Sequence, residues 1–458
     1  MLRVSTFIFR IMRKLSLLIL FLIAVNSIAR AQGCSNDFLG TKTLYQQSAQ
    51  AYTSAPAGYM PVFINHVGRH GARHLTKTVE STLAYQLLFK ADSAGQLSAD
   101  GFKLKQMVLA LQKAENGNTK SISAEGKMEL EGIGERMAKN YGNVFASGAA
   151  LNVRITKEAR TKQSADAFVQ GLNKRLPQPV MADPHNDDIN LRFYDLSPAY
   201  KKFENDIDDS DTKTSFDRQL HLETINNDVA SKFFKPEFLN KLDDKQKGKF
   251  VSDLFGFTTI VYSLQNEVSK AGLTMQDVDF KSFFTCEQLA ALAMLDSADE
   301  YLKKGPGVDN EGIQVRVAIP LLVDFIKSAD DFIKTGKYSA ELRFAHAETI
   351  APFAALLQIE GADKPSTNIK QIDKVWQASK IIPLSSNIQW IFYKKKGSGD
   401  YLVKILLNEK EARISALSTV KNSSYYQWKM LRSFYLKKLS MLHVSLTDDM
   451  NTYLADLK

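Results

Sequence analysis

The chain has 458 residues, of which 44% are hydrophobic and 24% charged, a globular composition with enough apolar material for a sizeable core. Its net charge is +9, but residues 1–31 contain five of the Lys and Arg residues and no Asp or Glu, so the remainder carries +4. This mild excess argues against a nucleic-acid partner and is compatible with an anionic small molecule. Nothing in the composition indicates an obligatory protein partner.

Residues 1–31 are typical of a secretory signal peptide. An apolar run over 15–25 follows a basic segment, and Ala29-Arg30-Ala31 has the small-x-small pattern of a cleavage site. The run is shorter than the roughly 20 residues that a membrane-spanning helix needs. We therefore expect cleavage near Ala31 and export to the periplasm or out of the cell.

Two cysteines, Cys34 and Cys286, leave three alternatives open. In an exported protein they either pair as a disulfide or stay free thiols, or Cys34 is acylated as in a lipoprotein. Two cysteines so far apart do not have the spacing of a zinc site.

The first part of the chain alternates strand and helix patterns. Residues 60–64 predict a strand, followed by a glycine-containing loop over 68–71 and a second strand at 152–156. The expected helices are 79–93, 102–115, 128–141 and 158–172. Strands that alternate with helices indicate an α/β fold with a parallel sheet.

The pattern changes after Pro177. Residues 183–336 are charged, helical in pattern and poor in strand signals, which predicts an inserted helical subdomain. Strand signals return at 340–344, a helix is expected at 349–358, and 387–393 with 401–407 predict a β-hairpin. The expected fold class is α/β, with a central, mostly parallel sheet flanked by helices. Two halves of this core, 32–182 and 337–458, enclose the helical cap.

The segment Arg69-His70-Gly71-Ala72-Arg73 indicates the chemistry most clearly. It follows a predicted strand, and ligands of open α/β sheets bind beyond the carboxyl ends of strands. The two guanidinium groups match phosphate oxygens, and their charge disfavours protonation of His70. Because neutral imidazole is the form that attacks phosphorus, the segment predicts a nucleophile together with phosphate-binding arginines.

Two other interpretations of this segment are weaker. A basic surface loop would not require particular residue types at four positions, as the Arg69–Arg73 segment has. His66, His70 and His74 are four residues apart, as metal ligands on one helix face would be, but Gly68 and Gly71 and the preceding strand disfavour a helix there. We therefore expect no metal and no other cofactor.

Arg-His-Gly-x-Arg after a strand resembles the signature of the histidine acid phosphatases, branch 2 of the histidine phosphatase superfamily. Leu130-Glu131-Gly132-Ile133-Gly134 resembles their Leu-Thr-x-x-Gly segment, with Glu131 in place of Thr. Residues 153–172 resemble their second arginine segment, in which Arg160 matches the third phosphate-binding arginine. The resemblance extends over about residues 62–408.

His346-Ala347-Glu348 distinguishes between branches of this family. Phytases of the acid type and acid phosphatases carry His-Asp there, whereas His-Ala-Glu is typical of multiple inositol polyphosphate phosphatases. Residues 191–195 also resemble that subfamily. Ser197 stands where animal members often have Cys, so their disulfide pattern is not carried over.

The resemblance and the chemistry together imply roles for these residues. His70 is expected to form a phosphohistidine, and Glu348 to protonate the leaving alcohol and then activate water. The phosphoryl oxygens are expected to be held by Arg69, Arg73, Arg160 and His346. Nearby arginines lower the pKa of a carboxyl group, so we expect an acidic to near-neutral optimum.

Charges outside the motifs have two interpretations. Lys77 and Arg192 either contact further phosphates of a polyphosphorylated ring or are solvated surface charges. Lys201-Lys202 and Lys303-Lys304 are interpreted as solvated helix faces.

The expected function is a phosphomonoesterase that converts phytate and other inositol polyphosphates to lower inositol phosphates. A general or sugar-phosphate acid phosphatase of the same fold is the enzymatic alternative. A non-catalytic phosphoinositide-binding or adhesive surface lipoprotein, acylated at Cys34, is the other.

Overall fold

The computed structural model describes residues 34–145, 150–420 and 423–458. The predicted signal peptide of residues 1–31 lies outside these ranges. All strands and α-helices below belong to the unit formed by residues 39–458. Within the described ranges, no helix has the length and apolar character needed to span a membrane, and neither Cys34 nor Cys286 is a free thiol.

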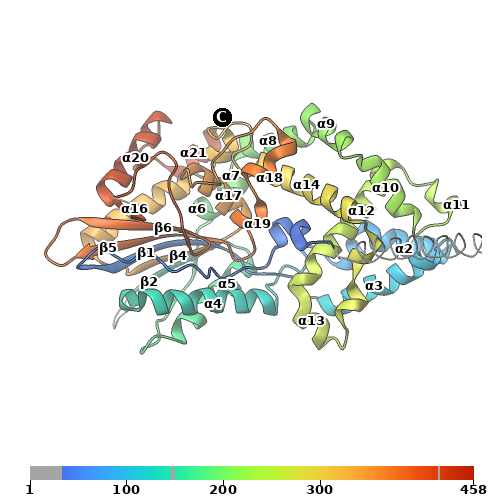
Figure 1. Cartoon of the computed structure of the whole chain (residues 1–458), viewed down its shortest axis with the longest axis horizontal. Helices are drawn as coiled ribbons and strands as arrows, with labels where there is room; N and C mark the ends of the chain where they lie inside the picture. The colour runs from blue at the N-terminus through green and yellow to red at the C-terminus, as the bar shows by residue number, and fades with distance from the viewer. Residues whose placement is uncertain (1–33, 146–149, 421–422) are drawn as a thin grey trace, which may run out of the picture. The chain divides into compact units, whose positions relative to one another are not determined.

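Eight strands in the described ranges form one sheet in the order β3-β2-β4-β1-β5-β6-β7, with β8 paired to β6 (Figure 1). They are β1 (Tyr59–Arg69), β2 (Leu151–Ile155), β3 (His185–Asn186), β4 (Ala340–Ala345), β5 (Asn387–Lys395), β6 (Tyr401–Leu407), β7 (Lys410–Glu411) and β8 (Tyr425–Gln427). β1 to β4 are parallel, and β5 to β8 add antiparallel pairs. The predicted α/β class is confirmed, and the sheet is mixed because the predicted hairpin, β5 and β6, joins β1 antiparallel.

The central strand β1 is buried on both faces. Phe63 and Val67 point into one apolar layer, and Ile64 points into the other. His66 lies on the side of Ile64, where its ring packs against Phe168 and Phe344 at centroid distances of 5.3 and 5.5 Å. This alternation with both sets buried is what a strand covered on both faces requires.

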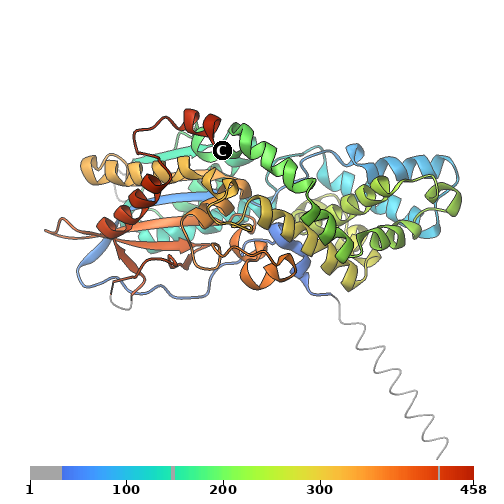
Figure 2. The ribbon, with the colours of Figure 1, turned by 90° about the horizontal axis from the view of Figure 1, so that it is seen from above.

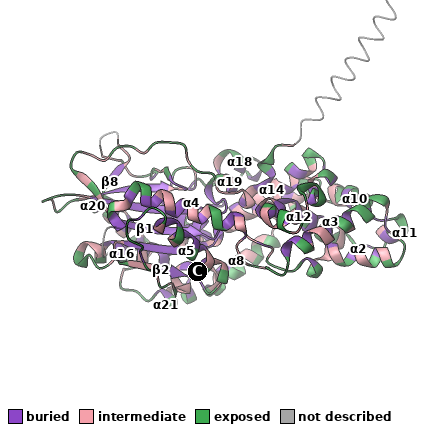
Figure 3. Ribbon diagram, turned by 90° about the horizontal axis from the view of Figure 1, so that it is seen from below, coloured by how far each residue is buried: buried purple, intermediate pink, exposed green. Residues whose placement is uncertain are grey.

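Helices cover both faces of the sheet (Figure 1). α4 (Ala124–Tyr141) and α5 (Ala159–Asn173) pack on the face of Ile64, and α16 (Ile319–Thr335), α17 (Ala347–Leu356) and α20 (Trp428–Met441) pack on the face of Phe63. Figure 3 shows the sheet buried and the exposed residues concentrated on the outer helices.

A second group of helices packs beside the sheet (Figure 2). It combines α2 (Leu83–Ser93) and α3 (Ala99–Glu115) with α10 (Leu222–Ser231), α12 (Asp244–Ile260) and α13 (Gln265–Lys270). The helical part therefore includes residues 83–115 in addition to much of the predicted insertion, 183–336. The remaining α-helices are α6 (Asp188–Leu191), α7 (Phe193–Leu196), α8 (Pro198–Asp208), α9 (Asp211–Gln219), α11 (Pro236–Leu239), α14 (Cys286–Lys303), α15 (Ile313–Arg316), α18 (Ile372–Val375), α19 (Ala378–Ile381) and α21 (Met450–Asp456).

Glycines allow α4 to approach its neighbours closely. A Cβ at Gly134 would lie 2.1 Å from the carbonyl oxygen of Phe168 on α5, and one at Gly126 would lie 2.0 Å from that of Ala72. These distances are far below van der Waals contact, so only glycine fits. The Leu130–Gly134 segment singled out in the sequence thus carries a helix-packing glycine and does not itself line the 69–73 segment.

Replacing Gly134 by Ala should destabilise the protein by about 1–3 kcal/mol, because the new methyl group meets rigid backbone of α5. Gly132→Ala is the matched control, since its Cβ would meet only the flexible end of Arg136, 3.0 Å away. A gain of up to about 1 kcal/mol is expected there from helix propensity. Urea unfolding of both variants measures the difference, and equal stabilities would contradict the packing explanation.

Candidate active site

The carboxyl ends of three adjacent parallel strands meet at one edge of the sheet. Gly68 of β1 and Ile155 of β2 both pair with Phe344 of β4, which lies between them. His70, Thr156 and His346 follow these strand ends directly. Segments far apart in the sequence are thereby brought together at the place where α/β sheets bind ligands.

His70 is buried at the end of β1. Its backbone N–H donates to the carbonyl of Ala345, at 2.9 Å, which ties the 69–73 segment to β4. Its ring Nδ1 lies 2.9 Å from the carbonyl oxygen of Gly71. Because a carbonyl only accepts, Nδ1 carries the proton and Nε2 keeps its lone pair. Burial, and then the charge of Arg69, hold the pKa of His70 well below its usual value, so the imidazole is neutral.

The guanidinium groups of Arg69, Arg73 and Arg160 form what we call the arginine cluster. Arg69 Nη1 donates to the carbonyls of Thr41 and Ile382, at 2.7 and 2.6 Å. Arg73 Nη1 donates to the carbonyl of His74, at 2.8 Å. Burial and the repulsion of the other two arginines lower the pKa of Arg73 to about 10.

The Nε atoms of all three arginines of the cluster are buried and have no hydrogen-bond partner among the described residues. Buried donors are normally satisfied, and oxyanions satisfy guanidinium donors best. The cluster therefore has the donors and the charge to hold a tetrahedral phosphoryl group beside Nε2 of His70.

His346 contacts Arg160 of the arginine cluster with one ring nitrogen and Thr156 with the other. Nη2 of Arg160 lies 3.2 Å from Nδ1 of His346, and Nε2 of His346 lies 3.0 Å from Oγ1 of Thr156. Since Arg160 only donates, Nδ1 accepts and Nε2 donates. The His346 and His70 rings meet edge to face, with centroids 5.5 Å apart. Contact of His346 with a phosphoryl oxygen stays a prediction.

Arg192 reaches the cluster through a shared carboxylate, whereas Lys77 does not. Glu158 accepts from Arg160 and from Arg192, each at 2.7 Å. Although burial opposes it, the hydrogen bond from Arg192 and the charge of Arg160 lower the pKa of Glu158 to about 2. Arg192 also pairs with Asp195. Lys77 is exposed on the loop between Arg73 and α2 and lies outside this buried network.

Glu348 lies in the first turn of α17 and pairs with Lys304, whose Nζ is 3.1 Å from Oε1. Lys304 also binds Glu300 at 2.8 Å and is only 14% exposed. Its interpretation as part of a solvated helix face is therefore wrong, because the fold turns the end of α14 toward α17. Burial raises the pKa of Glu348, but the charge of Lys304 prevails and holds it well below its usual range.

Lys42 is a further cation at this site that the sequence did not indicate. It follows Thr41, the residue whose carbonyl binds Arg69, in the 3-10 helix η1 (Asn36–Lys42). Burial and the charges of Arg73 and Arg69 lower the pKa of Lys42 to about 8, while Asp296 opposes the change. No motif in the surrounding sequence marks this residue.

The other two histidines of the 66–74 region face different surroundings. His66 packs in the core between Phe168 and Phe344, and Nδ1 of His74 lies 3.1 Å from Glu115. Within the described ranges, no group of three or more His, Cys, Asp or Glu side chains has a geometry that fits a metal ion. The three histidines that the sequence spacing had grouped thus have different partners, because β1 ends at Arg69 and only His66 lies on the strand.

Comparison with known proteins identifies the family of the chain. Residues 62–408 match the model of the histidine phosphatase superfamily, branch 2. In sequence, no curated protein matches the chain.

In structure, the chain is similar to the multiple inositol polyphosphate phosphatase of Bifidobacterium longum, solved with inositol hexasulfate (TM-score 0.75, 22% identity, covering 87% of this chain and 97% of that one). The complex of that enzyme with phosphate gives a TM-score of 0.74 at 21% identity, over 90% and 99% of the chains. A phytase from D. castellii gives 0.63 at 14% identity, over 91% and 89%.

The match to the superfamily covers most of the chain, including β1, β2, β4 and the hairpin that joins β1. It contains all three segments that the strand ends bring together, with His70 and the arginine cluster. At these identities the structural likenesses establish the fold. The chain therefore belongs to branch 2 of the histidine phosphatase superfamily and is a phosphatase.

Proposed function

We propose that the protein hydrolyses inositol polyphosphates, phytate among them, through a phosphohistidine on His70 and without a metal ion. The observation that carries the proposal is the neutral His70, with Nε2 unprotonated, beside three guanidinium groups whose buried Nε atoms have no partner among the described residues. The similar solved structures are those of an inositol polyphosphate phosphatase and a phytase, which supports the choice of substrate.

The first step transfers the phosphoryl group to the enzyme. Nε2 of His70 forms a bond to phosphorus while the bond from phosphorus to the ester oxygen breaks, and Glu348 gives its proton to the leaving alcohol. The arginine cluster stabilises the charge on the phosphoryl oxygens. In the second step water attacks the phosphohistidine, Glu348 accepts its proton, and inorganic phosphate leaves.

Glu348 must be protonated to act as an acid, although Lys304 favours its ionised form. A bound phosphate dianion adds negative charge near Glu348 and therefore raises its pKa. The substrate thus favours the protonation that its own cleavage requires.

Cations beyond the arginine cluster support a substrate with several phosphates. Arg192 shares the carboxylate of Glu158 with Arg160. Lys42 lies close enough to Arg73 and Arg69 for their charges to lower its pKa, and Lys304 pairs with Glu348. A single phosphate occupies the arginines, so these further charges suit other phosphates on the same ring. We also propose export of the mature protein, on the basis of residues 1–31.

His70→Ala should lower phosphate release from phytate by at least about four orders of magnitude, because the nucleophile is lost. The exposed His185→Ala is the control and should retain full activity. Activity of the wild type should persist in excess chelator. Full activity of the His70 variant, or loss of activity with chelator alone, would contradict the mechanism.

Glu348→Gln should slow the release of alkyl leaving groups from phytate by about 100-fold, since an alkoxide needs a proton on departure. p-Nitrophenyl phosphate should be affected much less, because p-nitrophenolate leaves unprotonated. Initial rates on both substrates measure the ratio. Equal slowing on both would count against the acid role.

Lys304→Met should extend activity to higher pH. The ammonium group of Lys304 lowers the pKa of Glu348, so its removal raises that pKa and keeps the acid protonated at higher pH. The alkaline limb of the kcat profile on phytate should therefore move upward. The control is Lys303→Met, because the ammonium group of Lys303 pairs with Asp208 and Asp299. An alkaline limb that does not move in Lys304→Met would contradict the coupling between Lys304 and Glu348.

A further inference from the structure

Arg69 is held in place by two chain segments from opposite ends of the protein. Its Nη1 donates to the carbonyl of Thr41 in η1 and to that of Ile382, which follows α19. The two segments are also bonded to each other, because the N–H of Leu384 donates to the carbonyl of Thr43, at 3.0 Å. The position of this guanidinium therefore depends on loops that lie outside the motif.

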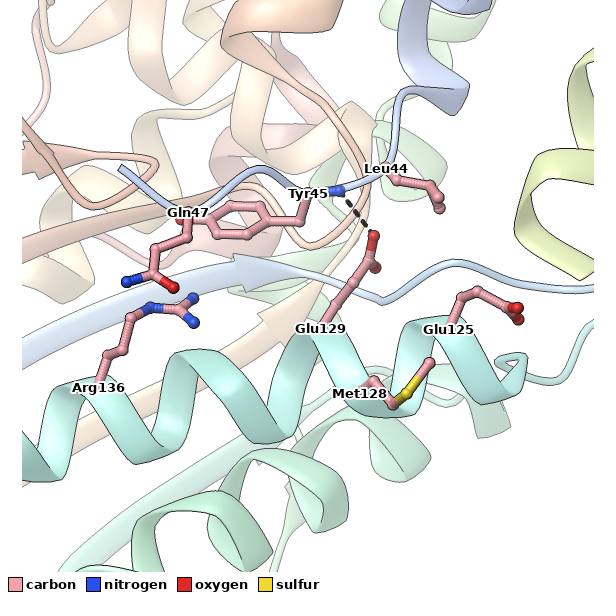
Figure 4. Close-up of a pocket in the computed structure, with 7 residues that line it drawn as sticks. All are labelled: Leu44, Tyr45, Gln47, Glu125, Met128, Glu129 and Arg136. Atoms are coloured by element: carbon pink, nitrogen blue, oxygen red, sulfur yellow. Dashed lines mark hydrogen bonds between the residues drawn. The ribbon is translucent and has the colours of Figure 1, made fainter. Parts of the chain in front are cut away.

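One carboxylate on α4 contacts both of these segments and the 69–73 segment as well. Oε1 of Glu129 accepts from the N–H of Tyr45 at 2.7 Å, a contact visible in Figure 4. Oε2 accepts from the N–H of Ala72 at 2.9 Å and from the hydroxyl of Ser385 at 2.7 Å. Three separate parts of the chain thus share a single acceptor group.

The segment around Ser385 is directly bonded to the nucleophile. The N–H of Ser385 donates to the carbonyl of His70 at 3.1 Å, and the N–H of Arg69 donates to that of Ser386 at 2.7 Å. Ser385 has a φ of +56°, in the left-handed region that non-glycine residues adopt only at a cost in energy. Its hydrogen bond to Glu129 helps to hold that conformation.

Glu129 occupies an electrostatically costly position. Burial raises the pKa of its carboxyl group, although the N–H groups of Tyr45 and Ala72 and the Ser385 hydroxyl lower it. The same side chain lines the pocket of Figure 4, between the 44–47 segment and α4. Helix packing alone does not require a charged group there.

We propose that Glu129 is a positioning residue that holds the arginine cluster and His70 in the geometry needed to bind and transfer a phosphoryl group. It acts through the backbone of the 41–45, 69–73 and 382–386 segments and does not touch the substrate. The inference rests on the proposed phosphatase mechanism. It extends that mechanism to a residue directly before the Leu130–Gly134 segment.

Glu129→Gln tests the role. A carboxylate offers an acceptor to both Tyr45 and Ala72, whereas an amide has one oxygen and turns a donor toward the other N–H. We expect kcat/KM for p-nitrophenyl phosphate and the affinity for inorganic phosphate to fall by about 100-fold, as for displacements of about 1 Å. Both are normalised to active sites counted by the p-nitrophenol burst.

Two further variants separate positioning from folding. Glu131→Gln on the same helix removes a carboxylate that pairs with the exposed lysines Lys127 and Lys174, and it should stay within about twofold of wild type. Ser385→Gly removes one donor to Glu129 while relieving the left-handed backbone conformation. It should weaken phosphate binding by about fivefold without lowering the melting temperature.

The outcomes distinguish this inference from the proposed function. Unchanged kcat/KM and phosphate affinity per active site in Glu129→Gln and Ser385→Gly would overturn the positioning role, whatever their melting temperatures. The proposed function would still stand if the wild type releases phosphate in the same assays. A wild type that neither binds phosphate nor forms a burst would overturn both.

Discussion

Three guanidinium groups are gathered around one neutral imidazole, and their mutual repulsion is the constraint on which the rest of this site depends. The negative charges of Glu158, Glu129 and Glu348 offset part of this repulsion. The dipoles of the carbonyls that bind Arg69 and Arg73 offset another part. Carbonyls hold an arginine without cancelling its charge. The cluster therefore keeps a net attraction for an oxyanion, and burial together with the same field keeps the His70 imidazole neutral.

This arrangement needs rigid support from the sheet and from α4. The carboxyl ends of β1, β4 and β2 bring His70, His346 and Thr156 to one edge, with β4 between the other two strands. α4 then approaches the 69–73 segment so closely that glycine is required at Gly126. Buried strands set the direction of each backbone, and the helix limits how far the loop can move.

The sequence predicted most of this site because its chemistry is local. Arg69, His70 and Arg73 lie in one segment, and Arg160 and His346 follow strands whose patterns were evident. The interpretation of Lys303-Lys304 failed for a tertiary reason, since a lysine at a helix end looks solvated until the fold brings Glu348 within 3.1 Å. Lys42 and Glu129 lacked a signal because their partners are backbone groups or distant arginines.

The sequence by itself determined the superfamily, the candidate site residues His70, Arg69, Arg73 and Arg160, and the alternation of strands and helices, because residue type and short spacing carry that information. Only the tertiary structure decided that the sheet is mixed, that residues 83–115 join the helical part, and that His66 is a core residue. Only the tertiary structure placed Glu158 between Arg160 and Arg192 and left Lys77 exposed. These properties depend on which distant segments pack together, and a pattern along the chain does not encode that contact directly.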